Sequence, residues 1–149
     1  MKTAIIFYSR HHENTKKLLE AIKNASSDEI DLFDITESVP QNLEKYDRIG
    51  FASGIYYSKF EKRVLEFAKN NTPDGKKVFF IYTYSAERNG YTKAIREAIS
   101  GKNAKILGEY GCLGFNTFGP FKLIGGIAKN HPDNTDISGA VSFYNNLEK

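Results

Sequence analysis

Short apolar segments typical of strands alternate with amphipathic segments typical of helices along most of the chain. The strand-like segments are residues 4–8, 30–35, 49–52, 78–82 and 104–113. Helical periodicity of apolar residues follows four of them, over residues 14–25, 60–68, 94–101 and 137–147. Right-handed crossovers join parallel neighbouring strands, so this alternation predicts a parallel sheet with helices on both faces. We therefore predict an α/β fold, a doubly wound three-layer sandwich with a five-stranded parallel sheet in the order 2-1-3-4-5.

The apolar content of two strands predicts their places in the sheet. Residues 78–82 are the most continuously apolar run of the chain. Such a run is typical of a strand covered on both faces, so we place it at the sheet centre. Residues 30–35 are interrupted by Asp31 and Asp34, a mixed pattern that suits an edge strand.

Composition limits the domain count and the compartment. A chain of 149 residues with 40% hydrophobic and 26% charged residues fits one domain, residues 1–149. Cys112 is the only cysteine, and with three scattered histidines it predicts neither an internal disulfide nor a metal site. No segment approaches the ~20 apolar residues of a membrane span, and the N-terminus lacks a signal-peptide cleavage site. We expect a cytoplasmic protein.

The charge of the chain argues against one class of partner. A formal charge of +3, from 21 basic and 18 acidic residues spread along the sequence, is too small an excess to indicate nucleic-acid binding. Arg10, Lys59 and Arg88 lie near the predicted binding loops. Taken singly, each is interpreted as solvated surface charge, with an influence on the approach of a partner or substrate as the alternative.

In a sheet of this order, ligands bind beyond the carboxyl ends of strands one and three, where the winding direction reverses. The relevant loops begin at Ser9, Ser53 and Thr83. The first loop leads into a helix N-terminus, whose free backbone N–H groups and positive dipole end favour a phosphate. This loop has neither a dinucleotide-binding nor a nucleoside-triphosphate glycine motif. It therefore predicts a site for the phosphate of a mononucleotide, with Asn14 and Thr15 as further donors.

The second and third loops are rich in aromatic side chains. Residues 53–58 present Ile55, Tyr56 and Tyr57, which could cover a flat ring or fold back onto the core. Gly54 permits a close backbone approach or a positive φ angle. Residues 83–91 are polar with further tyrosines. A phosphate at one loop and a planar ring between the other two describe flavin mononucleotide, FMN.

Three motifs, at the predicted strand ends, resemble the flavodoxin family. The first loop, with Tyr8-Ser9 and His12-x-Asn14-Thr15, resembles the phosphate loop of a flavodoxin-like branch. The second motif is residues 50–56, and the third runs from Cys112-x-Gly114-Phe115 through residue 120 to residues 125–127. The resemblance covers nearly the whole chain.

The resemblance implies where FMN is held. Residues 9–15 would bind the phosphate, residues 53–57 would flank the isoalloxazine ring, and residues 83–85 would bind its pyrimidine edge. The predicted cofactor-binding residues are Ser9, Arg10, His11, His12, Asn14, Thr15, Ser53, Gly54, Ile55, Tyr56, Tyr57, Thr83, Tyr84 and Ser85. Glu13 and Tyr56 stand where the family commonly has glycine. A carboxylate beside a phosphate costs energy unless it points to solvent or pairs with Arg10.

Three functions are compatible with these patterns. The first is an electron carrier in which FMN shuttles electrons between redox partner proteins and no side chain is catalytic. The second is an FMN-dependent NAD(P)H:quinone or small-molecule reductase on the same fold. The third is an interaction module whose phosphate site has decayed. Residues 116–134 are predicted to cap the edge strand, or alternatively to form a lid or a docking surface.

Overall fold

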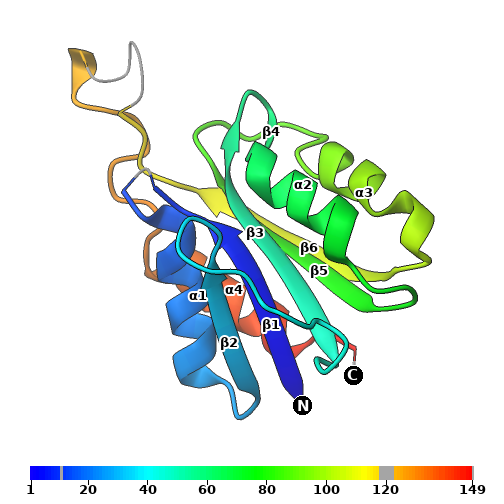
Figure 1. The fold of residues 1–149 in the computed structure, drawn as a ribbon. Coiled ribbons are helices and arrows are strands. Elements are labelled where there is room, and N and C mark those ends of the chain that lie inside the picture. The colour runs from blue at the N-terminus through cyan, green and yellow to red at the C-terminus, as the bar shows by residue number, and fades with distance from the viewer. Residues whose placement is uncertain (11, 118–122, 149) are drawn as a thin grey trace.

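A computed structural model describes residues 1–10, 12–117 and 123–148 of the chain (Figure 1). Its parallel strands are β1 (Lys2–Tyr8), β2 (Glu29–Asp34), β3 (Arg48–Tyr56), β5 (Lys77–Tyr84) and β6 (Lys105–Leu113). The α-helices are α1 (Asn14–Ala25), α2 (Lys62–Asn71), α3 (Lys93–Ala98) and α4 (Asn134–Asn145). A short strand β4 (Lys59–Phe60) and a 3₁₀ turn η1 (Ser100–Lys102) complete the described elements.

The sheet confirms the predicted topology. Its long strands lie in the order β2-β1-β3-β5-β6 and are all parallel. In chain order this is the predicted 2-1-3-4-5 arrangement, with β2 at an edge as expected. The addition is β4, which pairs antiparallel with the end of β3. The central strand is β3, so the prediction that residues 78–82 form the central strand is wrong, since they belong to β5. A continuous apolar run indicates that both faces of a strand are covered, but it does not indicate the position of the strand in the sheet.

Helices cover both faces of the sheet, and each face has its own core (Figure 1). Side chains of β1 alternate between the two: Ile6 packs on the face of α2 and α3, and Ile5 on the face of α1 and α4. Leu18 and Leu19 of α1 are completely buried. Burial of each such side chain contributes roughly 1.5–3 kcal/mol, so docking on the sheet stabilises the helix more than its own propensity does.

The connection from β3 to α2 differs from the prediction. Phe60 follows the helical periodicity of residues 60–68 but belongs to β4, and α2 begins at Lys62. The Glu61 side chain accepts the backbone N–H of Arg63 at 2.8 Å and so caps the helix. The Phe60 ring is buried, 6.2 Å from the ring of Phe80 in an edge-to-face arrangement. An aromatic residue one turn before a helix thus extends the apolar pattern without being helical.

A buried ion pair lies at the opposite end of the sheet from the predicted loops. Arg48 is 1% exposed, and its Nη2 donates to Asp28 Oδ2 at 2.9 Å. The same oxygen accepts the Tyr144 hydroxyl at 3.0 Å, and the guanidinium lies 4.7 Å from the centre of the Tyr144 ring. Nε and Nη1 of Arg48 have no acceptor among the described residues. Asp28 is therefore the carboxylate partner of a desolvated cation.

Candidate functional site

A cavity of about 390 Å³ lies at the carboxyl ends of the strands, where the three predicted loops meet. Eleven of the predicted site residues line it: Ser9, Arg10, Asn14, Thr15, Gly54, Ile55, Tyr56, Tyr57, Thr83, Tyr84 and Ser85. Ser53 and His12 are not among its lining residues, and His11 lies outside the described part of the chain. The topology therefore brings together residues from three separate segments of the chain, which begin at Ser9, Gly54 and Thr83.

Ser53 and His12, the other two predicted site residues that the structure describes, contact residues behind the cavity wall. Ser53 is completely buried, and its hydroxyl accepts the backbone N–H of Glu61 at 3.0 Å, which fixes the start of α2. The His12 ring packs on Phe115 with ring centres 4.2 Å apart, and its Nε2 lies 2.9 Å from the Thr117 hydroxyl. His12 thus supports a lining residue instead of lining the cavity itself.

Sequence reasoning missed part of the lining. The additional residues are Ser58, Ala86, Arg88, Tyr91, Gly114, Phe115, Asn116 and Ile127. The third motif, after Cys112, contained the signal for the last four, because it extends β6 into the same end of the sheet. Within that segment Asn116 and Ile127 exchange backbone hydrogen bonds at 3.0 and 2.8 Å. Its described tip does not cap the edge strand, since Leu123 is 89% exposed and the segment projects from the body (Figure 1).

The N-terminus of α1 forms the polar wall of the cavity. The backbone N–H of Lys16 donates to Ser9 Oγ at 3.0 Å, and the hydroxyls of Thr15 and Thr83 are 3.0 Å apart. Asn14 Nδ2 donates to the Phe115 carbonyl at 2.8 Å, whereas the buried Asn14 Oδ1 has no partner among the described residues. The first turn of a helix also carries N–H groups without intrahelical acceptors. Hydroxyls, amides and the positive end of the helix dipole together suit a phosphate monoester.

Two tyrosine pairs form the other walls. Tyr84 and Tyr91 stack with ring centres 5.6 Å apart, and Tyr56 meets Tyr8 edge-to-face at 5.7 Å. Burial is the main cause of a raised Tyr84 pKa, so its phenol stays protonated and can donate a hydrogen bond. Residues 53–56 belong to β3, which corrects the prediction of a loop from Ser53 to Ser58.

The turn of that hairpin has an unusual conformation. Tyr57 and Ser58 connect β3 to β4, with φ angles of 51° and 66°. Two-residue hairpins with positive φ at both turn positions commonly carry Asn-Gly, since other residues in this conformation cost roughly 1–2 kcal/mol each. Gly54, by contrast, has no positive φ angle. The strained positions therefore lie at the cavity rim and not at the glycine.

Comparison with known proteins bears on this arrangement. A family model of the flavodoxin domain matches residues 5–108, more than half of the chain. The chain belongs to the flavodoxin family. A curated relative, the uncharacterised protein MJ0298 of Methanocaldococcus jannaschii, is 37% identical over 153 residues, covering 100% of this chain and 99% of the relative.

Solved flavodoxins share the fold of this family member at low sequence identity. A flavodoxin from the domain Archaea is 18% identical with a TM-score of 0.69, covering 95% of this chain and 92% of its own. Flavodoxin 1 from Bacillus cereus is also 18% identical, with a TM-score of 0.66 and coverage of 99% and 100%. These similarities concern the fold alone. In the described part of this flavodoxin-family chain, no helix is both long and apolar enough to cross a bilayer.

Glu13 is the clearest departure from the family's phosphate loop. It precedes α1 with a φ angle of 52°, and its exposed carboxylate lies 3.9 Å from Lys16 Nζ. It does not pair with Arg10, whose Nη2 donates instead to the Thr36 hydroxyl. Of the two predicted arrangements of Glu13, the structure thus shows the one in which its carboxylate points to solvent. Arg10 has no ion pair within the described residues and keeps its charge for the cavity that it lines.

Replacing Glu13 by glycine is expected to raise the free energy of unfolding by about 0.5–1 kcal/mol. Glycine adopts this backbone conformation without the steric cost, although the more flexible unfolded chain offsets part of the gain. Chemical denaturation of the apoprotein measures the change. Glu13→Gln is the matched control, because it removes the charge and keeps the strained backbone. Equal gains in both variants would show that charge, not conformation, limits stability here.

His131 and two aspartates anchor the segment that follows β6. The His131 carbonyl accepts the Phe115 N–H at 2.8 Å, and His131 Nδ1 lies 2.6 Å from Asp136 Oδ2. Asp133 and Asp136 also form the reciprocal capping box of α4. Spacing did not predict this grouping of three potential metal ligands. Their mutual hydrogen bonds account for the arrangement, so it supports a helix cap.

The hydrogen bond to Asp136 raises the pKa of His131, which makes stability depend on pH. A group with a raised pKa in the folded state stabilises the fold below its unfolded value, near 6.5, and loses this contribution at higher pH. We therefore expect the urea midpoint of the wild type, relative to His131→Gln, to be highest below about pH 6.5 and to fall above it. A difference that is constant from about pH 5.5 to 8.5 would contradict this assignment.

Cys112 is a buried thiol and is not among the residues that line the cavity. It is buried at the end of β6, and desolvation raises the pKa of its thiol to about 12. A thiol with this pKa is protonated at neutral pH and is a poor nucleophile. Cys112 is therefore best interpreted as a buried core residue.

Proposed function

We propose that this protein binds FMN in the cavity and transfers electrons between redox partner proteins. The observation that carries the proposal is the pairing of a helix N-terminus with aromatic walls around one 390 Å³ cavity. Membership of the flavodoxin family supports the same cofactor class. Together they favour a mononucleotide with a phosphate tail and a planar head.

The lining residues suit the parts of FMN. Ser9, Thr15 and the first turn of α1 would hold the phosphate, with Arg10 supplying positive charge. Asn14 Oδ1, buried without a partner among the described residues, would accept a hydrogen bond from a ligand hydroxyl. Tyr56 and Tyr84 would flank the ring. When bound, FMN supplies the redox chemistry, and the protein supplies binding, orientation and exclusion of water.

Titration of the apoprotein with FMN tests the cofactor. Binding between aromatic walls is expected to quench the flavin fluorescence at a stoichiometry of one per chain. Riboflavin is the matched ligand, because it keeps the ring but lacks the phosphate, and it should bind at least about tenfold more weakly. Absence of quenching by FMN would contradict the proposal and favour the interaction module without a cofactor.

Turnover distinguishes the carrier from the reductase. For a carrier, a reductive titration should resolve two one-electron steps, and the holoprotein should not oxidise NADH or NADPH with a quinone acceptor. Sustained nicotinamide oxidation would instead favour the FMN-dependent reductase. Both functions fit a cytoplasmic location, which stays a prediction.

A further inference from the structure

The residues that line the cavity and the segment that contains β2 carry opposite charge. The described residues that line the cavity include two arginines, Arg10 and Arg88, and no carboxylate. Residues 26–47, which contain β2 and its connection to β3, carry seven carboxylates and one lysine, a formal charge of −6. With +3 on the whole chain, the remaining residues carry +9. Charge is thus unevenly distributed along the sequence although the net charge is small.

Two basic side chains next to the hairpin have no carboxylate partner among the described residues. Lys59 follows the hairpin turn directly, and Arg88 lines the cavity together with Tyr57. Both side chains are exposed, and neither forms an ion pair with any described residue. By contrast, Arg63 is paired with Glu61 at 3.0 Å. We define Lys59 and Arg88 as the basic rim.

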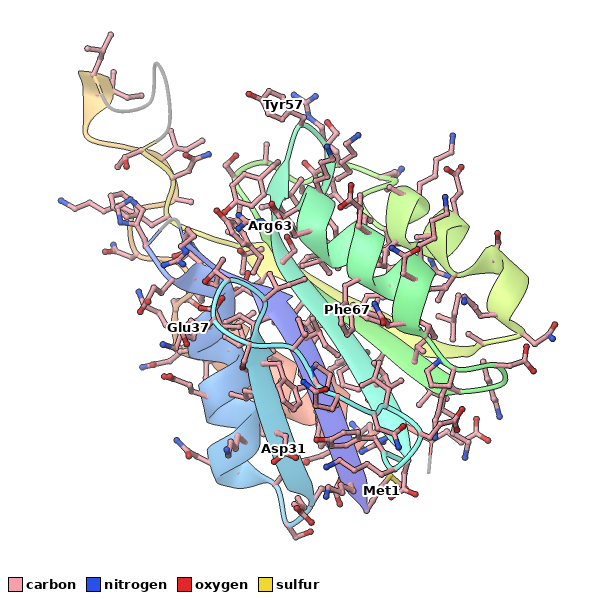
Figure 2. All side chains as sticks on the ribbon, viewed as in Figure 1. Met1, Asp31, Glu37, Tyr57, Arg63 and Phe67 are labelled. Atoms are coloured by element: carbon pink, nitrogen blue, oxygen red, sulfur yellow. The ribbon has the colours of Figure 1, made fainter. Side chains whose placement is uncertain are left out.

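An exposed aromatic side chain accompanies the basic rim. Tyr57 is 89% exposed at the tip of the β3–β4 hairpin, and Figure 2 shows it at the upper end of that hairpin. Its backbone φ of 51° holds it in a strained turn, so the exposure follows from the hairpin geometry and not from a loose loop. Tyrosine and arginine are both enriched at protein interfaces. In Figure 2, Asp31 and Glu37 lie on the side of β2, away from this tip.

We propose that the basic rim and Tyr57 form the docking surface for an acidic redox protein, whose carboxylates approach beside the cofactor cavity. This inference rests on the proposed function, because it places the partner next to the bound flavin. Exposed cations on separate segments, Lys59 in β4 and Arg88 in the connection after β5, suit a broad protein surface, whereas a small anion needs convergent, partly buried donors. Transient redox complexes are small, and rim charges act mainly on their association rate.

Electron transfer to two haem proteins of opposite charge tests the docking surface. Photoreduced holoprotein is mixed with an acidic or a basic c-type cytochrome, and the second-order rate constant is followed by haem absorbance. For the acidic cytochrome we expect the rate constant to fall at least about tenfold when ionic strength rises from about 20 to 300 mM. In Lys59→Glu/Arg88→Glu, the low-salt rate constant should fall by about tenfold and the salt dependence should disappear.

A matched variant separates local from global charge. Lys23→Glu/Lys69→Glu changes the net charge equally, at exposed lysines in the last turns of α1 and α2. Its low-salt rate constant with the acidic cytochrome should stay within about threefold of the wild type. An equal loss in both double variants, or a faster wild-type reaction with the basic cytochrome at low salt, would overturn the proposal. A loss seen only with NADPH as reductant would overturn it in favour of a small-anion site.

Flavin content keeps this proposal distinct from the proposed function. FMN affinity is measured for each variant first, and rate constants refer to holoprotein only. If the wild type fails to bind FMN, the proposed function fails. If it binds FMN but shows no charge-dependent reaction with the acidic cytochrome, only the docking surface is wrong.

Discussion

The variant Asp28→Ala is expected to lose about 3–5 kcal/mol in free energy of unfolding. Arg48 is 1% exposed, and Asp28 is the carboxylate within 2.9 Å of its guanidinium. Removing the carboxylate leaves a desolvated cation and withdraws an acceptor from the Tyr144 hydroxyl. Urea denaturation of the apoprotein followed by circular dichroism measures the loss.

Two further variants test the cause. Glu29→Ala removes a carboxylate from the next position, which is exposed and 3.4 Å from Lys2, and should change stability by less than about 1 kcal/mol. Adding Arg48→Met to Asp28→Ala should recover more than half of the loss, because no buried charge then remains. If the double variant is as unstable as Asp28→Ala, the cost arises from lost packing rather than from the unpaired cation.

The second large effect concerns cofactor affinity, and it rests on the proposed function. Arg10→Ala is expected to weaken FMN binding by about 10- to 100-fold, because a charge-assisted hydrogen bond to phosphate contributes about 1.5–3 kcal/mol. Arg10 lines the cavity beside the α1 N-terminus, and its contact with the neutral Thr36 hydroxyl leaves its charge available. Fluorescence titration with FMN measures the change.

Riboflavin serves as the internal control for Arg10. It lacks the phosphate, so its affinity should change less than about threefold in Arg10→Ala. Lys23→Ala, at the other end of α1, should leave the affinity for both flavins unchanged. An equal loss for riboflavin and FMN would place Arg10 at the ring or in the architecture of the loop, and not at the phosphate.

Local sequence patterns were sufficient for the order of the elements. The bounds of α1 agree with the prediction because the apolar spacing from Leu18 to Ile22 faces one core and polar residues face solvent. The extension of β3 to Tyr56 was not predictable in the same way. Residues 53–56 gain strand geometry from pairing with β4 and β5, and such pairing depends on residues distant in the chain.

The site residues that directly follow a strand were predictable from the sequence. Those that a distant segment of the chain brings to the cavity, such as Phe115, were not. Ser9, Gly54 and Thr83 line the cavity because parallel strands present their carboxyl ends on one edge. The contact between Asn14 and Phe115 joins residues 101 positions apart. The residue pattern within either segment does not indicate a contact with a residue so far away in the sequence.

From the amino-acid order alone follow the alternation of strands and helices, the parallel sheet, and three loops suited to a phosphate and a flat ring. Only the folded chain decides that Glu13 faces Lys16 and solvent, that Arg10 bonds to a neutral hydroxyl and forms no ion pair among the described residues, and that Tyr57 protrudes from a strained turn. The physical reason is the sequence separation over which each kind of interaction acts. Propensity and amphipathic spacing act over a few residues, whereas the fate of each charge depends on neighbours that packing brings close from distant parts of the chain.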